Sequence, residues 1–190
     1  MKYSILLAAL LSLATVAHAE DNRNFIKAES TYYSFDSSPN DKYGLNLQVG
    51  REVLPGIKVD IKQEFREFRE EENVQKPSNR FEGGLSYEEK VPFVKVGVRG
   101  AIGEKYTSGD SFGYWLVEPF VAYDLTNDVS VKGSWRYRNA FDSDKHDATN
   151  TYKVGVDYKF TTQTSFNLAL GKTTGDQEYA SFQGGVTYKF

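Results

Sequence analysis

Apolar and polar residues alternate along most of this chain, most regularly over its last thirteen residues, EYASFQGGVTYKF. Counting back from Phe190 to Ala180, every second residue is aromatic, apolar or small, and the residues between are mostly polar or small. A period of two is that of a β-strand with two chemically different faces. A strand of about ten residues suits a tilted crossing of a bilayer, with one face toward lipid and the other toward a polar interior. The same stretch would also suit the last strand of a soluble sandwich.

Ten segments share this period, and none shows a sustained helical period. We therefore predict ten strands, with boundaries placed to within about two to four residues. The segments are approximately 24–35, 42–53, 57–69, 80–91, 93–106, 113–125, 129–141, 150–160, 165–172 and 178–190.

The connections between these segments alternate in length. Four are tight, and most of these contain the turn residues Pro, Gly, Asn or Asp: 54–56, 92, 126–128 and 161–164. The other five are longer and polar: 36–41, 70–79, 107–112, 142–149 and 173–177. Short turns at one end and longer loops at the other are typical of an outer-membrane barrel, and a soluble sandwich has no reason to alternate in this way. The pattern predicts an all-β fold, a closed antiparallel transmembrane up-and-down β-barrel of about ten strands, with both termini on the short-turn, periplasmic side.

Two other strand counts are weighed against ten. Eight strands would require two segments to be merged or lost. Twelve would leave about fourteen residues for each strand with its connection, too few for strands of this length. As the tenth strand, the terminal segment should pair with segment 24–35, which closes the sheet and removes both edges.

The N-terminal region predicts export. Lys2, an apolar stretch over 5–16 and the sequence Ala17-His18-Ala19 are typical of a secretory signal peptide with its cleavage site. A permanent membrane helix is the alternative, but the apolar run is too short to span a bilayer. The predicted organisation is a signal peptide at 1–19 and an outer-membrane β-barrel at 20–190. The chain has no cysteine, so stability cannot come from disulfides. Its mean hydropathy of −0.54 does not exclude a barrel, because lipid-facing and lumen-facing residues average out.

Charged residues are distributed unevenly between the predicted interior and the loops. The strand face opposite the apolar one carries sixteen Lys and Arg and nine Asp and Glu. The longer loops and their edges carry four Lys and Arg and eleven Asp and Glu. The near-neutral total therefore conceals a basic interior beneath an acidic rim. On the apolar parity, aliphatic residues dominate mid-strand, and Tyr and Trp fit the aromatic belts found at membrane interfaces.

The interior cations suggest a function. Strand direction places Arg66, Arg136, Arg138 and Lys105 near the loop-side mouth, with acids mixed among the bases further down. Arginine suits bidentate contact with carboxylate or phosphate, and rings of Arg and Lys make anion-selective pores. We predict a narrow, anion-preferring porin that passes small acidic solutes. The alternative is a non-conducting structural or partner-binding barrel with an ion-paired interior, because small barrels are filled by their own side chains. The predicted pore-lining residues are Arg66, Arg80, Arg99, Arg136, Arg138, Lys42, Lys105 and Lys153.

The combination of signal peptide, ten strands, loop asymmetry and aromatic end resembles the small Gram-negative outer-membrane barrels. That resemblance implies that the alternating C-terminal residues are read by the barrel-assembly machinery, and the matching positions are Phe190, Tyr188, Val186 and Phe182. A weaker resemblance, to the oligogalacturonate-specific and sialic-acid-specific porins, rests on the stretch 133–138, GSWRYR, where Arg alternates with aromatics. Those porins are narrow barrels with inward arginines that pass acidic sugars, but they have twelve strands. The resemblance therefore implies anion preference and not a substrate.

No enzymatic chemistry is predicted. His146 lies in a loop beside Asp144 and Asp147, which resembles part of an omptin-type protease site, but a solvated loop histidine is the simpler interpretation. A hydrolase would need a carboxylate or Ser facing His146 across the mouth. With no Cys, a metal-ligand cluster is not expected, and no cofactor or nucleic acid is expected. The expected partners are outer-membrane lipid, the barrel-assembly machinery during biogenesis, and small anionic solutes.

Overall fold

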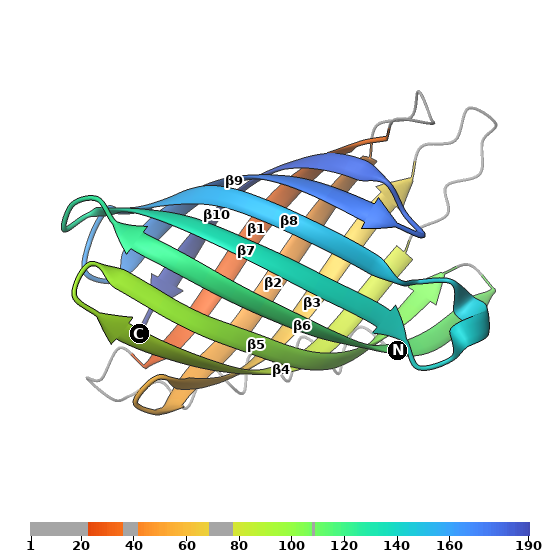
Figure 1. Ribbon diagram of the computed structural model, residues 1–190, viewed down its shortest axis with the longest axis horizontal. Coiled ribbons are helices and arrows are strands. Elements are labelled where there is room, and N and C mark those ends of the chain that lie inside the picture. The colour runs from red at the N-terminus through yellow and green to blue at the C-terminus, as the bar shows by residue number, and fades with distance from the viewer. Residues whose placement is uncertain (1–22, 36–41, 69–77, 108) are drawn as a thin grey trace.

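The computed structural model describes residues 23–35, 42–68, 78–107 and 109–190, which form one closed barrel (Figure 1). Ten strands and one short 3-10 helix, η1, follow one another along the chain. No described helix is long and apolar enough to span a bilayer. The strands are β1 (Asn24–Ser34), β2 (Lys42–Leu54), β3 (Ile57–Phe68), β4 (Ser78–Val91), β5 (Val94–Thr107), β6 (Asp110–Asp124), β7 (Val129–Ala140), β8 (Thr149–Lys159), β9 (Thr164–Gly175) and β10 (Tyr179–Lys189), and η1 is Ser143–Lys145.

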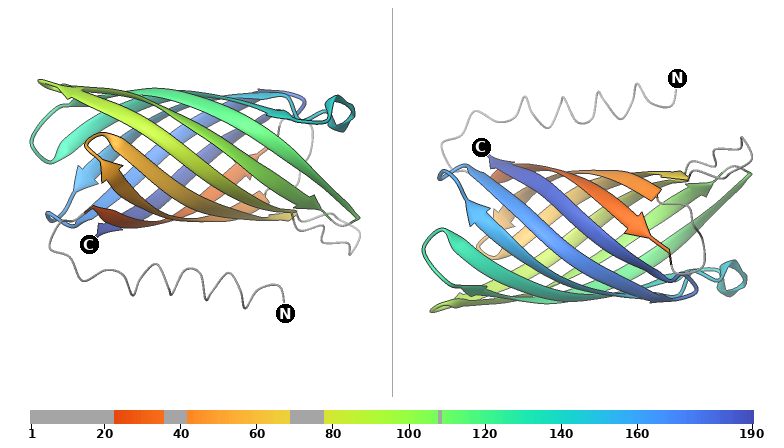
Figure 2. Two further views of the ribbon diagram at one scale, coloured as in Figure 1. Left: turned by 90° about the horizontal axis from the view of Figure 1, so that it is seen from below. Right: turned by 90° about the horizontal axis from the view of Figure 1, so that it is seen from above.

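Each strand pairs antiparallel with its neighbours in sequence, and β10 returns to β1. The closing pair runs from Phe25 opposite Lys189 to Ser34 opposite Ala180. Figure 2 shows the strands running obliquely around a continuous wall. The predicted all-β, up-and-down barrel of ten strands is therefore confirmed, and the strand ends lie within three residues of the predicted ones. Closure satisfies the backbone groups that an open edge would leave exposed to lipid.

One proline interrupts the hydrogen-bonded wall. Pro119 lies in the middle of β6 and has no N–H to donate to a ladder. It stays in register with Val98 of β5, but the pairing of β6 with β7 skips Glu118 and Pro119. The skipped positions lie opposite Trp135 and Arg136.

The tight turns and the C-terminus lie at one end of the barrel, which we call the turn side (Figure 1). The β6–β7 and β8–β9 turns are stabilised in the same way. In each, a threonine hydroxyl, that of Thr126 or Thr161, accepts hydrogen bonds from the backbone N–H groups two and three residues further on. Such side-chain bonds to the backbone favour turns over continued strand. In the β4–β5 turn, Phe93 takes a positive φ of 65° directly after Pro92.

The opposite end, the loop side, carries η1 (Figure 1). The β7–β8 loop is bound to both of its neighbours. The Lys145 ammonium lies 3.0 Å from the Asp110 carboxylate, and this hydrogen bond raises the pKa of Lys145. On the other side, the Asp176 carboxylate accepts a 2.7 Å hydrogen bond from the N–H of Ala148. The predicted signal peptide, loop 36–41 and most of loop 70–79 lie outside the described residues.

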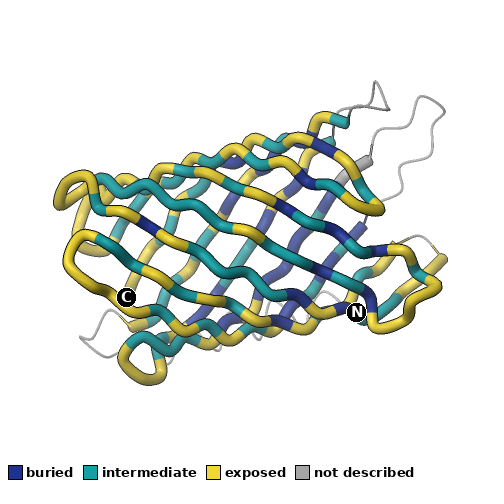
Figure 3. The backbone as a smooth tube through the Cα atoms, viewed as in Figure 1, coloured by how far each residue is buried: buried dark blue, intermediate teal, exposed yellow. Residues whose placement is uncertain are grey.

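The two faces of the wall differ as the alternation predicts. Outward residues are exposed and apolar, as in Leu85 and Val154, which are 57% and 63% exposed. Aromatic residues such as Trp115, Trp135 and Tyr188 also face outward, with more than a third of their surface exposed. The buried residues are mostly polar or charged, and they gather in the half of the barrel nearer η1 (Figure 3). The barrel is thus apolar outside and polar inside, with its densest packing on the loop side.

Inward-facing glycines make room for large side chains from neighbouring strands. A Cβ at Gly103 would lie 2.5 Å from the carbonyl oxygen of Phe81 and 2.8 Å from the ring of Tyr114. A Cβ at Gly84 would lie 2.6 Å from the guanidinium of Arg99. The glycines of the inner face therefore help to determine where the bulky side chains of the lumen lie.

Candidate functional site

Buried side chains fill the loop-side half of the lumen and form what we call the loop-side layer. Its members come from six strands and from the β7–β8 loop, and each exposes 8% of its surface or less. The layer consists of Tyr33, Glu64, Arg66, Arg80, Glu82, Tyr114, Arg138, Asp147 and Tyr179. Tyr114, which β6 contributes to this layer, has no exposed surface at all.

Glu64 is the acceptor at one side of the layer. It receives hydrogen bonds from Arg66, from the Tyr33 hydroxyl at 2.8 Å and from Nη1 of Arg80 at 3.5 Å. The Arg66 guanidinium lies 4.4 Å from the ring centre of Tyr33 and 5.4 Å from that of Tyr179. Arginine can therefore be buried here, because a carboxylate neutralises it and aromatic rings cover its faces.

Asp147 is the acceptor at the other side. Its carboxylate lies 3.0 Å from Nζ of Lys105, 2.7 Å from Nε of Arg138 and 3.1 Å from Nε2 of Gln177. Burial alone would raise the pKa of Asp147, but Arg138 and Lys105 outweigh it and hold that pKa below the usual value of 3.8. The β7–β8 loop therefore places a buried anion over the end of the lumen, 1% exposed, between two cations.

Two further arginines make ion pairs near mid-height. Arg99 donates to both oxygens of Asp60, at 2.6 and 3.0 Å, and to Glu82 at 3.1 Å. Arg136 approaches Glu118 to 2.6 Å, where the β6–β7 pairing skips Pro119. Each pair crosses between strands, so it ties the inner face of the wall together.

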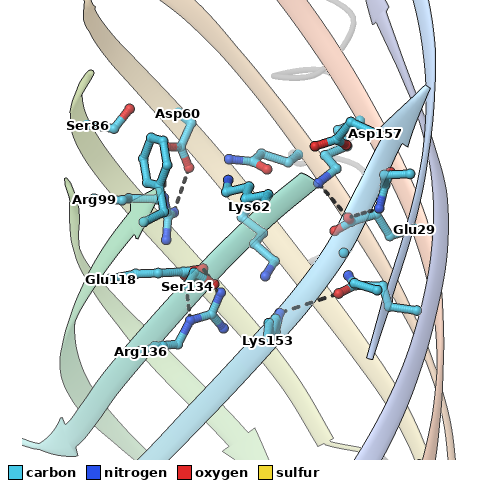
Figure 4. A pocket seen from close by; sticks show the side chains of 18 of the residues that line it. Glu29, Asp60, Lys62, Ser86, Arg99, Glu118, Ser134, Arg136, Lys153 and Asp157 are labelled. Atoms are coloured by element: carbon cyan, nitrogen blue, oxygen red, sulfur yellow. Dashed lines mark hydrogen bonds and ion pairs between the residues drawn. The ribbon is translucent and has the colours of Figure 1, made fainter. Parts of the chain in front are cut away.

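Below these pairs lies a cavity of about 250 Å³, which we call the turn-side chamber. Figure 4 shows its labelled side chains, including Asp60, Lys62, Glu118, Arg136 and Lys153, around a common space. A second cavity of about 30 Å³ lies within the loop-side layer. The lumen is therefore a chamber on one side and a nearly filled layer on the other.

The structure places the eight predicted pore-lining residues in three situations. Arg66, Arg80, Arg138 and Lys105 lie in or against the loop-side layer, and Arg99, Arg136 and Lys153 line the turn-side chamber. Lys42 lies apart from both, with its ammonium 3.9 Å from the ring centre of Phe35. Acids mix with bases further down, as expected, but the mixing also extends to the loop side, where Glu64 and Asp147 contact the upper arginines directly. Of the cations predicted near the loop-side mouth, Arg66, Arg138 and Lys105 lie there in ion pairs, whereas Arg136 lies lower and pairs with Glu118.

Sequence reasoning missed three tyrosines and one aspartate of this layer. Tyr33, Tyr114 and Tyr179 share the parity of the inward charged residues, which was an available signal for lumen aromatics. Asp147 was assigned to the acidic rim, and no periodicity places a loop residue inside the barrel. Only the path of the β7–β8 loop brings Asp147 to Arg138.

A hydrolase would need an acidic partner for His146. Asp147 does not serve as that partner, because its carboxylate binds Arg138 and Lys105. His146 is exposed and takes a positive φ of 46° after η1, where it ends the helix. Within the described ranges, no group of His, Asp and Glu is arranged to hold a metal ion.

No protein-family model and no curated protein sequence matches this chain. The solved NanC porin is similar in structure, with a TM-score of 0.56 at 12% identity, over 87% of this chain and 100% of the porin. LpxR from Salmonella typhimurium has a TM-score of 0.53 at 10% identity, over 91% of this chain and 86% of LpxR.

OmpTdeltaL8, a loop deletion mutant of OmpT, an outer membrane protein of Vibrio cholerae, has a TM-score of 0.44 at 14% identity. This chain spans 61% of that protein's length, with 90% of its own residues aligned. At these identities the similarities concern the fold. Together with the closed ten-stranded wall, the similarities to NanC and LpxR show that this chain has the fold of the outer-membrane β-barrels, which porins share.

Proposed function

We propose that this chain is an outer-membrane β-barrel whose lumen is closed by the loop-side layer. The observation that carries this proposal is the burial of Arg80, Glu82, Tyr114 and Asp147, each 2% exposed or less, across the interior. These residues come from β4, β6 and the β7–β8 loop, and the layer continues to β10, where the Tyr179 hydroxyl accepts a 3.3 Å hydrogen bond from Arg66 of β3. In this conformation the barrel stabilises the envelope or presents its loops to a partner.

Ion pairing supports this closed state. The upper arginines contact carboxylates, so separating the layer would leave buried charges without partners. Removing one member of a buried pair typically costs about 3–5 kcal/mol, which opposes spontaneous opening. A small barrel filled by its own side chains is the usual arrangement at low strand number.

The second candidate is a narrow, anion-preferring porin. The turn-side chamber favours it, since seven cationic and five carboxylate side chains line that cavity. The fold likeness to the NanC porin is consistent with a transport role. For conduction, the loop-side layer would have to open, and the pore-lining residues would be the eight predicted cations, with Arg136 and Arg138 contributing to anion preference.

Planar-bilayer recording separates the two candidates. The wild-type barrel should show no discrete conductance steps, whereas a Tyr114→Ala, Tyr179→Ala double variant should show them because two buried rings are removed. The outward-facing Tyr87→Ala, Tyr152→Ala pair is the control and should stay silent.

Discrete wild-type steps with an anion reversal potential in a salt gradient would overturn the closed interpretation in favour of the porin. In that case Arg136→Ala and Arg138→Ala should each weaken anion preference. A silent double variant that is folded would contradict the assignment of the layer as the closure.

A further inference from the structure

The turn-side chamber contains more cationic groups than its carboxylates neutralise. Four pairs form directly: Lys27 with Glu29 at 2.5 Å, Lys58 with Glu88 at 2.7 Å, Arg99 with Asp60 at 2.6 Å and Arg136 with Glu118 at 2.6 Å. The chamber lining then retains Lys62, Lys132 and Lys153 against a single further carboxylate, Asp157. An excess of positive charge therefore remains inside the wall.

Among these lysines, Lys62 combines burial with the lack of a direct contact to a described carboxylate. It is 7% exposed, and among the described residues no carboxylate oxygen lies within 4 Å of its ammonium. The Lys132 ammonium has an alternative partner, since it lies 4.2 Å from the ring centre of Phe120. Since no described carboxylate contacts this ammonium directly, its remaining solvation has to come from water or a bound anion in the chamber that it lines.

Lys153 and Arg136 meet Lys62 at the boundary between the chamber and the small upper cavity. All three line both cavities, together with Gln183. Nζ of Lys153 makes a long contact, 3.4 Å, to the amide oxygen of Gln183, and Arg136 forms its ion pair with Glu118. Figure 4 shows Lys62, Arg136 and Lys153 extending toward the same part of the chamber from β3, β7 and β8.

We propose that Lys62, Lys153 and Arg136 form a binding site for a small oxyanion, of the charge and size of inorganic phosphate, reached from the turn side. Two ammonium groups and a guanidinium supply charge-assisted hydrogen bonds, and Gln183 supplies an uncharged amide. The surrounding carboxylates limit the site to one small anion, since a larger polyanion would meet Glu29 and Glu118. The site does not depend on whether the lumen conducts, so a silent barrel in bilayer recording leaves it intact.

Isothermal titration of the purified barrel in nanodiscs with inorganic phosphate tests this site. Wild type should bind saturably at one site per chain, and its melting temperature should rise with phosphate concentration, as expected for a ligand of the native state. Lys62→Gln and Lys153→Gln should each raise the Kd at least tenfold and reduce the thermal shift. Lys62→Arg, which retains the charge, should bind within a few fold of wild type.

The matched control is Lys90→Gln, which removes the same charge from the exposed turn-side rim, where the lysine side chain is 64% exposed. It should leave the Kd unchanged. The proposal is overturned if wild type does not bind phosphate saturably, or if Lys90→Gln weakens binding as much as Lys62→Gln. Near-UV circular dichroism establishes whether each variant is folded. If Lys62→Gln does not fold, the Kd of the Lys153→Gln variant tests the phosphate site.

Discussion

At the scale of single residues, Asp147 joins parts of the chain that are far apart in sequence. Its carboxylate accepts hydrogen bonds from Lys105 of β5, Arg138 of β7 and Gln177 of the β9–β10 loop. Asp147→Asn should lower the free energy of unfolding by about 3 kcal/mol, because two buried cations lose their carboxylate. Urea unfolding in lipid vesicles measures this change. Asp144→Asn, an exposed substitution in the same loop, is the control and should change stability by no more than about 0.5 kcal/mol.

The lowered pKa of Asp147 also predicts a pH dependence. A carboxyl group whose pKa is lower in the folded state stabilises the protein above its unfolded pKa, near 3.8, and this stabilisation is lost as pH falls through the folded value. From about pH 5 to about pH 2, wild type should therefore lose more stability than Asp147→Asn does. Parallel pH profiles for the two proteins would contradict the role of Arg138 and Lys105 in holding the carboxylate ionised.

Two glycines of β5 give a matched test of packing in the lumen. Gly103→Ala should destabilise the barrel by about 1–3 kcal/mol, because the new Cβ meets the Phe81 carbonyl and the Tyr114 ring. Gly100→Ala, on the outward parity of the same strand, meets no atom within 4 Å and should be nearly neutral. The comparison is made by urea midpoint in the same lipid, and equal losses would show that strand propensity, rather than lumen packing, explains the effect.

The sequence predicted which face of a strand a side chain lies on, but not which carboxylate each arginine contacts. Parity correctly assigned Arg66, Arg99 and Arg138 to the inward face. It could not show which carboxylate each arginine contacts, since that depends on the stagger between strands and on side-chain rotamers. Arg99, for example, contacts Asp60 on β3, although β4 lies between their strands.

At the scale of elements, strand existence and order were predictable because the two faces of every strand meet different surroundings. The short helix η1 was not predicted, since three residues carry no period. Pro92 predicted the β4–β5 turn, but not the positive φ of Phe93, a conformation that usually selects glycine.

The terminal strand yields an element-scale prediction. Phe190 exchanges backbone hydrogen bonds with Asn24, and its ring stacks on Tyr188 at 6.0 Å, so it lies at the seam where β10 meets β1. Deletion of Phe190 should reduce the amount of barrel assembled in the outer membrane while leaving the properties of inserted molecules unchanged. Fractionation of cells expressing the deletion, with Lys189→Gln as a control at the neighbouring lumen position, measures this effect. Normal assembly of the deletion would count against the assembly-signal role and not against the barrel.

At the scale of the whole molecule, orientation across the membrane can be tested directly because the sequence contains no cysteine. A membrane-impermeant maleimide added to intact cells should label Asp144→Cys, on the loop side, and not Asn127→Cys, on the turn side. Both positions are exposed, so accessibility of the side chain itself is matched. Permeabilised cells should label both, and the reverse pattern in intact cells would place the termini outside.

Closure and strand number were predictable at this scale, because they follow from periodicity and from counting. The filling of the lumen was not, because the same excess of cations fits an open channel and an ion-paired layer. Asp147 shows the difference, since one loop carboxylate turned inward forms ion pairs with two of the predicted pore-lining cations.

The loop-side layer has an evolutionary consequence. Its members are side chains carried by a wall whose hydrogen bonds do not involve them, so substitutions within the layer alter the bore without altering the backbone scaffold. If the layer closes the lumen as we propose, a few exchanges, such as Tyr114 and Tyr179 to smaller residues, would separate a closed barrel from a permeable one on the same ten strands. Descendants of one such ancestor would therefore diverge in permeability faster than in architecture, and barrels of indistinguishable shape would differ in whether they let anything through.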